Sequence, residues 1–259
     1  MTIDVNPDWW KTLFDEVYLV TDARSVGDDN ITWQEIEIFT SLVPMLAQDR
    51  ILDLCGGHGR HAIELCRRGF HNCTVLDYSQ PLLDIGARNA AGKRYTVQFV
   101  QGDARHTTLI SEAFDHVLIL GNSLGYIPEP DADLRILHES RRLLKSGGWL
   151  LLDVTDGDAV HGKIAPQAWH EIDDDVVVCR QREVKDGRVC AREIVLSKNR
   201  GMIRDRTYCI RLYGADNLAA LVARAGFGNV QVHTDMSALN RMEDVGCMNH
   251  RLVVVARKP

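Results

Sequence analysis

Apolar and polar positions alternate in two different ways along this chain. Between residues 51 and 154, short apolar runs take turns with segments whose apolar residues recur every three or four positions. The short runs predict buried strands, and the longer spacing predicts amphipathic helices. The predicted strands are 51–54, 73–76, 97–100, 116–120 and 149–154, and the predicted helices between them are 62–68, 81–90 and 131–144. Strands that alternate with helices predict parallel βαβ units in an open sheet.

The pattern changes after residue 160. Residues 176–198 alternate apolar and polar side chains on both sides of Asp186-Gly187, a dipeptide typical of a two-residue hairpin turn. Residues 203–213 read as one more strand. We therefore predict an antiparallel sheet inserted into the α/β domain.

The two ends of the chain return to simple patterns. An apolar helical face is predicted over 8–18, and Thr32 and Glu35 have the spacing of a capping box that opens a second helix. Near the other end, a predicted helix over 215–227 is followed by strands over 230–233 and 252–256. The last two strands are too close for an ordinary crossover helix, which favours an antiparallel pair.

Composition narrows the class of protein. The chain has 259 residues, of which 45% are hydrophobic and 25% charged, as in a globular protein of one large domain with an insertion. No apolar run is long enough to span a bilayer, and the first residues lack the core of a secretory signal. With 30 basic and 36 acidic residues, the net charge of −6 offers no footprint for a nucleic-acid backbone. We expect a small-molecule partner, no nucleic acid and no membrane, and a monomer or homodimer.

Cysteine usage bears on the compartment. The seven cysteines are odd in number and lack C-x-x-C spacing; they are Cys55, Cys66, Cys73, Cys179, Cys190, Cys209 and Cys247. This pattern favours a reduced, cytoplasmic protein and argues against a disulfide framework or a structural zinc site.

The segment ILDLCGGHGRHAIEL, residues 51–65, carries the first functional signal. A glycine turn between a strand and a helix is a cofactor-binding feature, and Gly57, Gly59 and Ala62 loosely fit the dinucleotide fingerprint. Asp53 stands just before the glycines, where its charge would repel a pyrophosphate but suit a ligand with positive groups. S-adenosylmethionine (SAM) has an ammonium and a sulfonium and carries no phosphate.

Two further acids follow the next predicted strands. Asp77 ends the second strand, where a carboxylate can accept both ribose hydroxyls, and Asp103 follows the third, where it can accept from an adenine amino group beside Ala104. A ribose acid is common to NAD and SAM sites. Acids after all three strands favour SAM.

These motifs resemble those of the class I SAM-dependent methyltransferases. Asp53, Cys55, Gly57 and Gly59 are similar to the first family motif, D-x-[GAC]-x-G-x-G, with Cys55 where glycine is commonest. TVLDYS and VQGDAR resemble the ribose and adenine motifs. FDHVLILGNSLGYI, ESRRLLKSGGWLLLD and RLVVVARKP resemble the fourth strand with its loop, the fifth helix and strand, and the closing strand.

The resemblance implies a fold, a division into parts and an activity. The fold is α/β, a Rossmann-like seven-stranded sheet with helices on both faces and strand seven antiparallel. It is joined by an inserted antiparallel sheet and an N-terminal helical lid, as in the small-molecule methyltransferases. The implied parts are a lid over 1–44, a SAM-binding core over 45–160, a substrate-cap sheet over 161–213 and the rest of the core over 214–259.

The implied activity is transfer of a methyl group from SAM to an oxygen, nitrogen or carbon atom of a small molecule, giving S-adenosylhomocysteine. The alternatives are a SAM-binding regulatory protein without turnover and an NAD-dependent oxidoreductase.

Site residues follow from the motifs and from the loops beside them. The predicted cofactor residues are Asp53, Cys55, Gly57, Gly59, Asp77, Tyr78, Asp103, Ala104 and Asn122. The predicted substrate residues, from the loop after strand four and from the inserted sheet, are Ser123, Tyr126, Arg211 and Tyr213. In-line methyl transfer mainly needs alignment, so a base is optional. The candidates for a catalytic role are His161, His170 and, from the lid, Tyr18. His58 is expected to line the cofactor pocket, whereas His61 is expected to cap or face solvent. No metal site is predicted.

Overall fold

A seven-stranded sheet forms the centre of the computed structural model, which describes residues 2–22, 27–160, 164–234, 236 and 250–259. The strand order is β10-β11-β5-β4-β1-β2-β3. The strands are β1 Arg50–Leu54, β2 Asn72–Asp77, β3 Val97–Gln101, β4 Phe114–Ile119, β5 Leu144–Thr155, β10 Gly228–His233 and β11 Arg251–Arg257. β11 pairs antiparallel with both β5 and β10, whereas β1 to β5 pair parallel. The predicted Rossmann-like fold with an antiparallel closing pair is confirmed.

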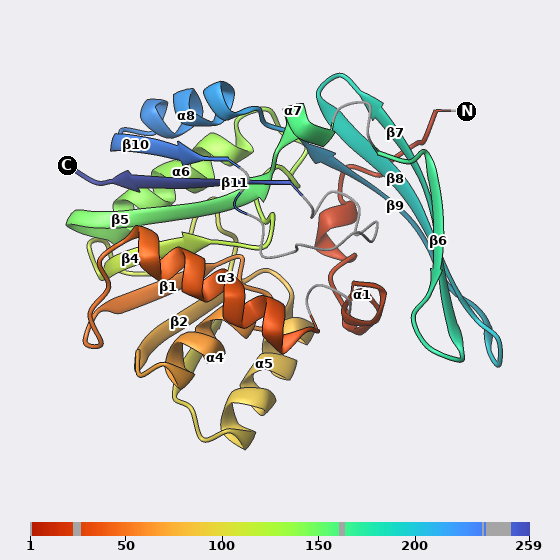
Figure 1. Ribbon diagram of the computed structural model, residues 1–259, viewed down its shortest axis with the longest axis horizontal. Coiled ribbons are helices and arrows are strands. Elements are labelled where there is room, and N and C mark those ends of the chain that lie inside the picture. The colour runs from red at the N-terminus through yellow and green to blue at the C-terminus, as the bar shows by residue number, and fades with distance from the viewer. Residues whose placement is uncertain (1, 23–26, 161–163, 235, 237–249) are drawn as a thin grey trace.

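Helices cover both faces of this sheet (Figure 1). On one side lie α3 Asp29–Leu42, α4 Arg60–Arg67 and α5 Gln80–Gly92, and on the other lie α6 Ala132–Leu143 and α8 Ala215–Arg224. Two apolar clusters, one on each face, bury strand residues such as Leu52 and Leu118 almost completely. Within the described part of the chain, no helix has the length and apolar character needed to cross a membrane.

The inserted sheet stands apart from the main sheet, with α1 Glu16–Thr21 between them (Figure 1). Its strands pair antiparallel in the order β6 Gln167–Glu171, β7 Val176–Lys185, β8 Arg188–Ser197 and β9 Gly201–Arg211. Asp186 and Gly187 both have positive φ angles, 51° and 69°, as the predicted two-residue turn requires. The structure therefore confirms the β7–β8 hairpin.

The N-terminal segment, residues 2–22, folds differently from the single helix predicted over 8–18. A short 3-10 helix, η1 Trp9–Lys11, and α1 replace that helix because Asp15 caps α1, accepting hydrogen bonds from the Val17 and Tyr18 amides. Asp28, rather than Thr32, caps α3. The predicted capping box of Thr32 and Glu35 is therefore wrong, and a further short helix, α7 Gly157–Val160, follows β5.

One disulfide joins Cys190 of β8 to Cys209 of β9. The two residues are directly opposite in the antiparallel ladder, with Cα atoms 4.0 Å apart. The expectation of fully reduced cysteines is wrong at this pair. The register of the two strands brings the cysteines together, and that register cannot be predicted from the spacing of cysteines in the sequence. Cys55, Cys66, Cys73 and Cys179 are free.

Candidate functional site

A cavity of about 240 Å³ lies at the carboxyl ends of the parallel strands. Residues of the N-terminal segment and the inserted sheet line the sides of the cavity that face away from the main sheet. One side, the loop wall, includes Cys55, Gly57, His58, Asp77, Asp103 and Ala104. The opposite side, the sheet wall, includes Arg180, Arg182, Ala191, Glu193, Arg204 and Tyr208 from β7 to β9. Ligands of open α/β sheets bind at this edge.

The glycine loop between β1 and α4 uses most of its amides within the protein. The Cys55 amide donates to the Leu76 carbonyl at 2.7 Å, and the Gly59 amide donates to the Gly56 carbonyl at 2.9 Å. The Gly57 amide donates to the Asp77 carboxylate at 2.8 Å. These contacts fix a tight turn, with Gly57 at a φ of 57°, and leave few amides directed at a ligand.

Asp77 lies between this loop and the next helix. Its second carboxylate oxygen accepts the Ser79 amide at 2.8 Å, so each oxygen has one backbone donor and capacity for another. Burial raises the pKa of Asp77, while the Ser79 and Gly57 amides lower it. The carboxylate is thus positioned to accept hydroxyl groups from a ligand in the cavity.

Asp103 and Tyr78 lie at the outer end of the loop wall. The Arg105 guanidinium binds Asp103 through two nitrogens and holds the pKa of that carboxyl below its usual value, against the effect of burial. Trp10, from the N-terminal segment, packs edge-on against Tyr78 with ring centroids 4.8 Å apart, and Arg105 lies over the Trp10 ring. Aromatic and acidic groups together suit a flat, amine-bearing ring.

Asp53 lies beneath the glycine loop rather than on the cavity surface. A Cβ atom on Gly56 would stand only 2.6 Å from the Asp53 Cγ, so glycine is required there to let the loop cover this buried carboxylate. Gly59 is also buried, against Phe99 and Val75 of the neighbouring strands. Asp53 therefore does not line the cavity, unlike the other predicted cofactor acids, since its side chain lies under the turn.

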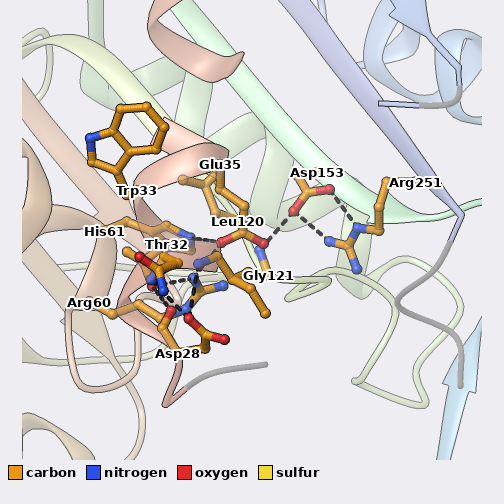
Figure 2. Close-up of polar contacts among 12 residues, drawn as sticks. Asp28, Thr32, Trp33, Glu35, Arg60, His61, Leu120, Gly121, Asp153 and Arg251 are labelled. Carbon is orange, nitrogen blue, oxygen red and sulfur yellow. Dashed lines mark hydrogen bonds and ion pairs between the residues drawn. The ribbon is translucent and has the colours of Figure 1, made fainter. Parts of the chain in front are cut away.

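A buried charge network supports the loop wall from behind, as Figure 2 shows. Glu35 of α3 forms an ion pair with Arg60, the first residue of α4, and contacts His61 Nε2 at 3.0 Å. These charges lower the pKa of Glu35 well below its usual value even though burial raises it. His61 is buried, not solvent-facing as expected from sequence, and both Arg60 and His61 reach the cavity.

The loop after β4, at the carboxyl edge of the sheet, is held by residues of β5. The Asp153 carboxylate accepts the Gly121 amide at 3.1 Å and pairs with the buried guanidinium of Arg251 (Figure 2). Asn122 accepts the Thr155 amide at 2.8 Å and donates to the Tyr126 hydroxyl at 3.3 Å.

Ser123, the next residue of this loop, donates to the Leu120 carbonyl at 2.6 Å. Asn122, Ser123 and Tyr126 all line the cavity as predicted, but the polar groups of Asn122 and the Ser123 hydroxyl are used to shape the loop. Their roles toward a ligand stay predictions.

Of the two catalytic candidates that the structure describes, Tyr18 lines the cavity and His170 does not. Its ring packs against Phe14 at 5.0 Å, and burial raises the pKa of its hydroxyl well above the usual value. The Phe14 carbonyl accepts the Ser79 hydroxyl at 2.5 Å, which ties the N-terminal segment to the residue that also caps α5. His170 lies outside the cavity lining, and His161 falls outside the described residues.

Arg211 and Tyr213 do not point into the cavity, contrary to prediction. Both bind Asp133 of α6, with the Tyr213 hydroxyl 2.5 Å from its carboxylate. The reason is the two-residue period of a strand, which places Arg211 on the opposite face from Tyr208. The sheet wall also carries four charged residues that were not predicted as site residues, namely Arg180, Arg182, Glu193 and Arg204. Residues two positions apart in a strand point to the same face, so the spacing of Arg180 and Arg182 was a usable signal.

His58 is the remaining titratable group on the loop wall. Burial and the nearby charges of Arg60 and His61 lower its pKa to about 4, so the imidazole is neutral at pH 7. It lines the cavity, as expected.

Comparison with known proteins defines the class. Residues 51–148 match the family described as "Methyltransferase domain". Residues 51–148 are thus similar to a methyltransferase domain, and the sheet order agrees with the resemblance predicted from sequence.

Curated relatives extend the same likeness over part of the chain. A demethylmenaquinone methyltransferase of Clavibacter sepedonicus is 33% identical over 150 residues, which cover 56% of this chain and 58% of that protein. A glycine/sarcosine N-methyltransferase of Aphanothece halophytica is 32% identical over 139 residues, 51% of this chain and 52% of that protein. The chain thus spans a little over half the length of these relatives.

Solved structures share the fold over nearly the whole chain. A SAM-dependent methyltransferase from Clostridium acetobutylicum superposes with a TM-score of 0.75 at 17% identity, covering 93% of this chain and 96% of the other. The sugar N-methyltransferase KedS8 from Streptoalloteichus has a TM-score of 0.68 at 20% identity, covering 100% and 99%. The inserted sheet and the N-terminal segment are therefore part of a fold found in other proteins.

Proposed function

We propose that this protein transfers the methyl group of SAM to an oxygen, nitrogen or carbon atom of a small molecule. The observation that carries the proposal is the cavity between the loop wall and the sheet wall, with the glycine loop and the strand-end acids on one side. The methyltransferase-domain match over the loop wall and its flanking strands supports it. S-adenosylhomocysteine is the expected second product.

The chemistry of the loop wall fits SAM. Asp77 is suited to the ribose hydroxyls, and Asp103 with Ala104 and Trp10 to the adenine end. The carboxylate of the methionine portion suits the start of α4, where Arg60 contributes a positive charge beside the helix N-terminus. When bound there, SAM supplies an activated methyl group that needs no further polarisation by the protein.

The other residues of the site align and shield the reactants. Leu13, Phe14 and Tyr18 cover the cavity from the N-terminal segment and exclude water from it. Alignment is the largest contribution a protein makes to an in-line transfer. Where the acceptor carries a proton, the neutral His58 imidazole on the loop wall can accept a hydrogen bond from it, although burial lowers the pKa of His58 to about 4 and makes it a weak base.

The alternatives are weaker on physical grounds. A dinucleotide needs free loop amides for its pyrophosphate, and four of the five amides from Cys55 to Gly59 are already bonded to Leu76, Asp77 and Gly56. A SAM-binding regulator without turnover binds no methyl acceptor, so it has no need of the sheet wall that faces the loop wall across the cavity. We also propose that the protein is cytoplasmic, is a monomer or homodimer, and has no nucleic-acid partner.

Native mass spectrometry of the purified protein, followed by an assay with methyl-labelled SAM, tests the proposal. We expect co-purified SAM or S-adenosylhomocysteine and label transfer to members of a panel of small nitrogen, oxygen and carbon acceptors. Bound SAM with no transfer across the panel would favour the regulatory alternative. An increase in NADH fluorescence on mixing would favour the oxidoreductase.

A further inference from the structure

The sheet wall contains a positive side chain, Arg182, that has no acidic partner among the residues the structure describes. Arg182 of β7 lines the cavity, and the one hydrogen bond of its guanidinium within the described chain joins Nη1 to the Ala165 carbonyl at 3.4 Å. No carboxylate of the described residues lies within 4 Å of its guanidinium. Every other arginine on this wall is compensated, so Arg182 differs from its neighbours.

The neighbouring charges are already paired with one another. Arg180 donates to Glu193 at 2.8 Å and lies 3.3 Å from Asp22 of the N-terminal segment. Arg204 forms an ion pair with Asp15, the capping residue of α1. Glu193 is therefore occupied, and within the described parts of the chain no other carboxylate pairs with Arg182.

Strand register places a notch beside this arginine. Arg182 is directly opposite Ala191 of β8, which in turn is opposite Tyr208 of β9. Adjacent strands are separated by about 4.8 Å, so Arg182 and Tyr208 stand roughly 10 Å apart at the backbone with only a methyl group between them. The guanidinium and the phenol therefore flank a space that a small group can enter.

The phenol is fixed in place and stays protonated. Trp9 packs against the Tyr208 ring at 5.9 Å, and no hydrogen bond of the Tyr208 hydroxyl occurs within the described residues. Burial raises the pKa of Tyr208 well above its usual value, while the charges of Arg180 and Arg182 act in the opposite direction. A protonated hydroxyl can donate to an anion that the arginine also holds.

We propose that Arg182 and Tyr208 form the binding subsite for a carboxylate on the methyl acceptor. The inference rests on the proposed function and narrows its substrate class to small acids. A planar carboxylate matches the forked geometry of a guanidinium, and the phenol hydroxyl supplies a further donor. The apolar residues Val189 and Ile210, one row further along the same face, suit the hydrocarbon part of such an acceptor.

The test uses the full chain saturated with S-adenosylhomocysteine and acceptors in matched pairs, such as 4-hydroxybenzoate with 4-hydroxybenzamide and glycine with glycinamide. Titration calorimetry measures the affinity for each member. We expect at least one carboxylate to bind roughly 10- to 100-fold more tightly than its amide in the wild type. Arg182→Gln abolishes that preference, and Tyr208→Phe reduces it.

Arg192→Gln is the matched control. Arg192 lies on the opposite face of β8, pairs with Asp205 and is half exposed, so its removal leaves the preference unchanged. If Arg182→Gln fails to fold, Tyr208→Phe and Arg182→Lys, which keeps the charge but loses the fork, carry the test. A panel in which no carboxylate exceeds its amide, or a preference that survives in both Arg182→Gln and Tyr208→Phe, overturns the inference.

Affinity for S-adenosylhomocysteine is measured first in each preparation. Failure of the wild type to bind it contradicts the proposed function. Normal binding without any carboxylate preference contradicts only the acid subsite.

Discussion

The two walls of the cavity are held in place by different kinds of contact. On the loop wall, polar groups bond mainly to the backbone of the same motifs, as Asp77 does to the Gly57 and Ser79 amides. On the sheet wall, Arg180 and Arg204 bond to Asp22 and Asp15 of the N-terminal segment, more than 150 residues away in sequence. The first wall is thus fixed by contacts within the α/β core, and the second depends on how the N-terminal segment docks.

This difference separates two tasks. A wall built from short motifs keeps one shape, which suits a cofactor common to many enzymes. A wall assembled from a sheet and a distant segment can change its side chains without altering the glycine loop, which suits an acceptor that differs between enzymes. We infer that substrate choice is made on the sheet wall.

The largest expected effect comes from removing the charge behind the loop wall. In Glu35→Gln, the guanidinium of Arg60, whose side chain is 9% exposed, loses its buried counter-charge. We expect the free energy of unfolding, measured by urea denaturation, to fall by about 3 kcal/mol. Glu37→Gln is the control, because Glu37 pairs with Arg68 at the surface and is expected to change stability by less than about 1 kcal/mol. Equal losses would show that the network does not support the wall.

His58 should make stability depend on pH. Its folded pKa, about 4, is below the ordinary value of 6.5, so the unfolded chain binds the proton more tightly and acid favours unfolding. The stability present above pH 6.5 is lost as the pH falls toward 4. Between pH 7 and pH 5 we expect a loss of about 2 kcal/mol in the wild type beyond that in His58→Gln. Parallel curves for the two proteins would contradict a buried, neutral imidazole.

Trp10 contributes to the cofactor end from the N-terminal segment. Because it is 8% exposed and packs on Tyr78, Trp10→Ala should weaken SAM binding about tenfold in calorimetric titration. Trp33 offers a matched control, since it also lies beneath an arginine but is 44% exposed on α3, away from the cavity. A similar loss in Trp33→Ala would point to a general effect on folding.

The smallest effect is expected on the outer face of the inserted sheet. Asp205 pairs with the half-exposed Arg192, so Asp205→Asn should lower the free energy of unfolding by less than about 1 kcal/mol. Because neither residue reaches the cavity, methyl transfer should be unchanged. A large loss of activity would mean that the outer face takes part in the site.

The parts of the molecule that follow short-range rules were predictable from sequence. The strand-end acids Asp77 and Asp103 and the glycine loop line the cavity, and the Asp186-Gly187 turn forms as expected, because each position depends on a few adjacent residues. Periodicity likewise predicted the main strands and the antiparallel closing pair. The position of Asp53 is an exception. Nothing in the motif indicates that this side chain lies under the turn and outside the cavity lining.

The remaining features depend on long-range packing. The spacing of Thr32 and Glu35 predicts a capping box, but the partners of Glu35 are Arg60 and His61, which lie on another helix and cannot be paired with it from local sequence. The Cys190–Cys209 disulfide requires the β8–β9 register, which turn lengths and a bulge near Val195 determine. Arg211 points away from the cavity rather than into it, because a shift of one residue along a strand is enough to move a side chain to the opposite face.

Titration of SAM into the wild type and two aspartate variants tests the central claim most directly. Asp77→Asn keeps the shape of a side chain that two backbone amides hold in the cavity, whereas Asp84→Asn alters an acid of α5 that pairs with Gln80. We predict one SAM bound per chain by the wild type and by Asp84→Asn, and no measurable binding by Asp77→Asn. Undiminished binding by Asp77→Asn, or none by the wild type, would contradict a SAM site on the loop wall.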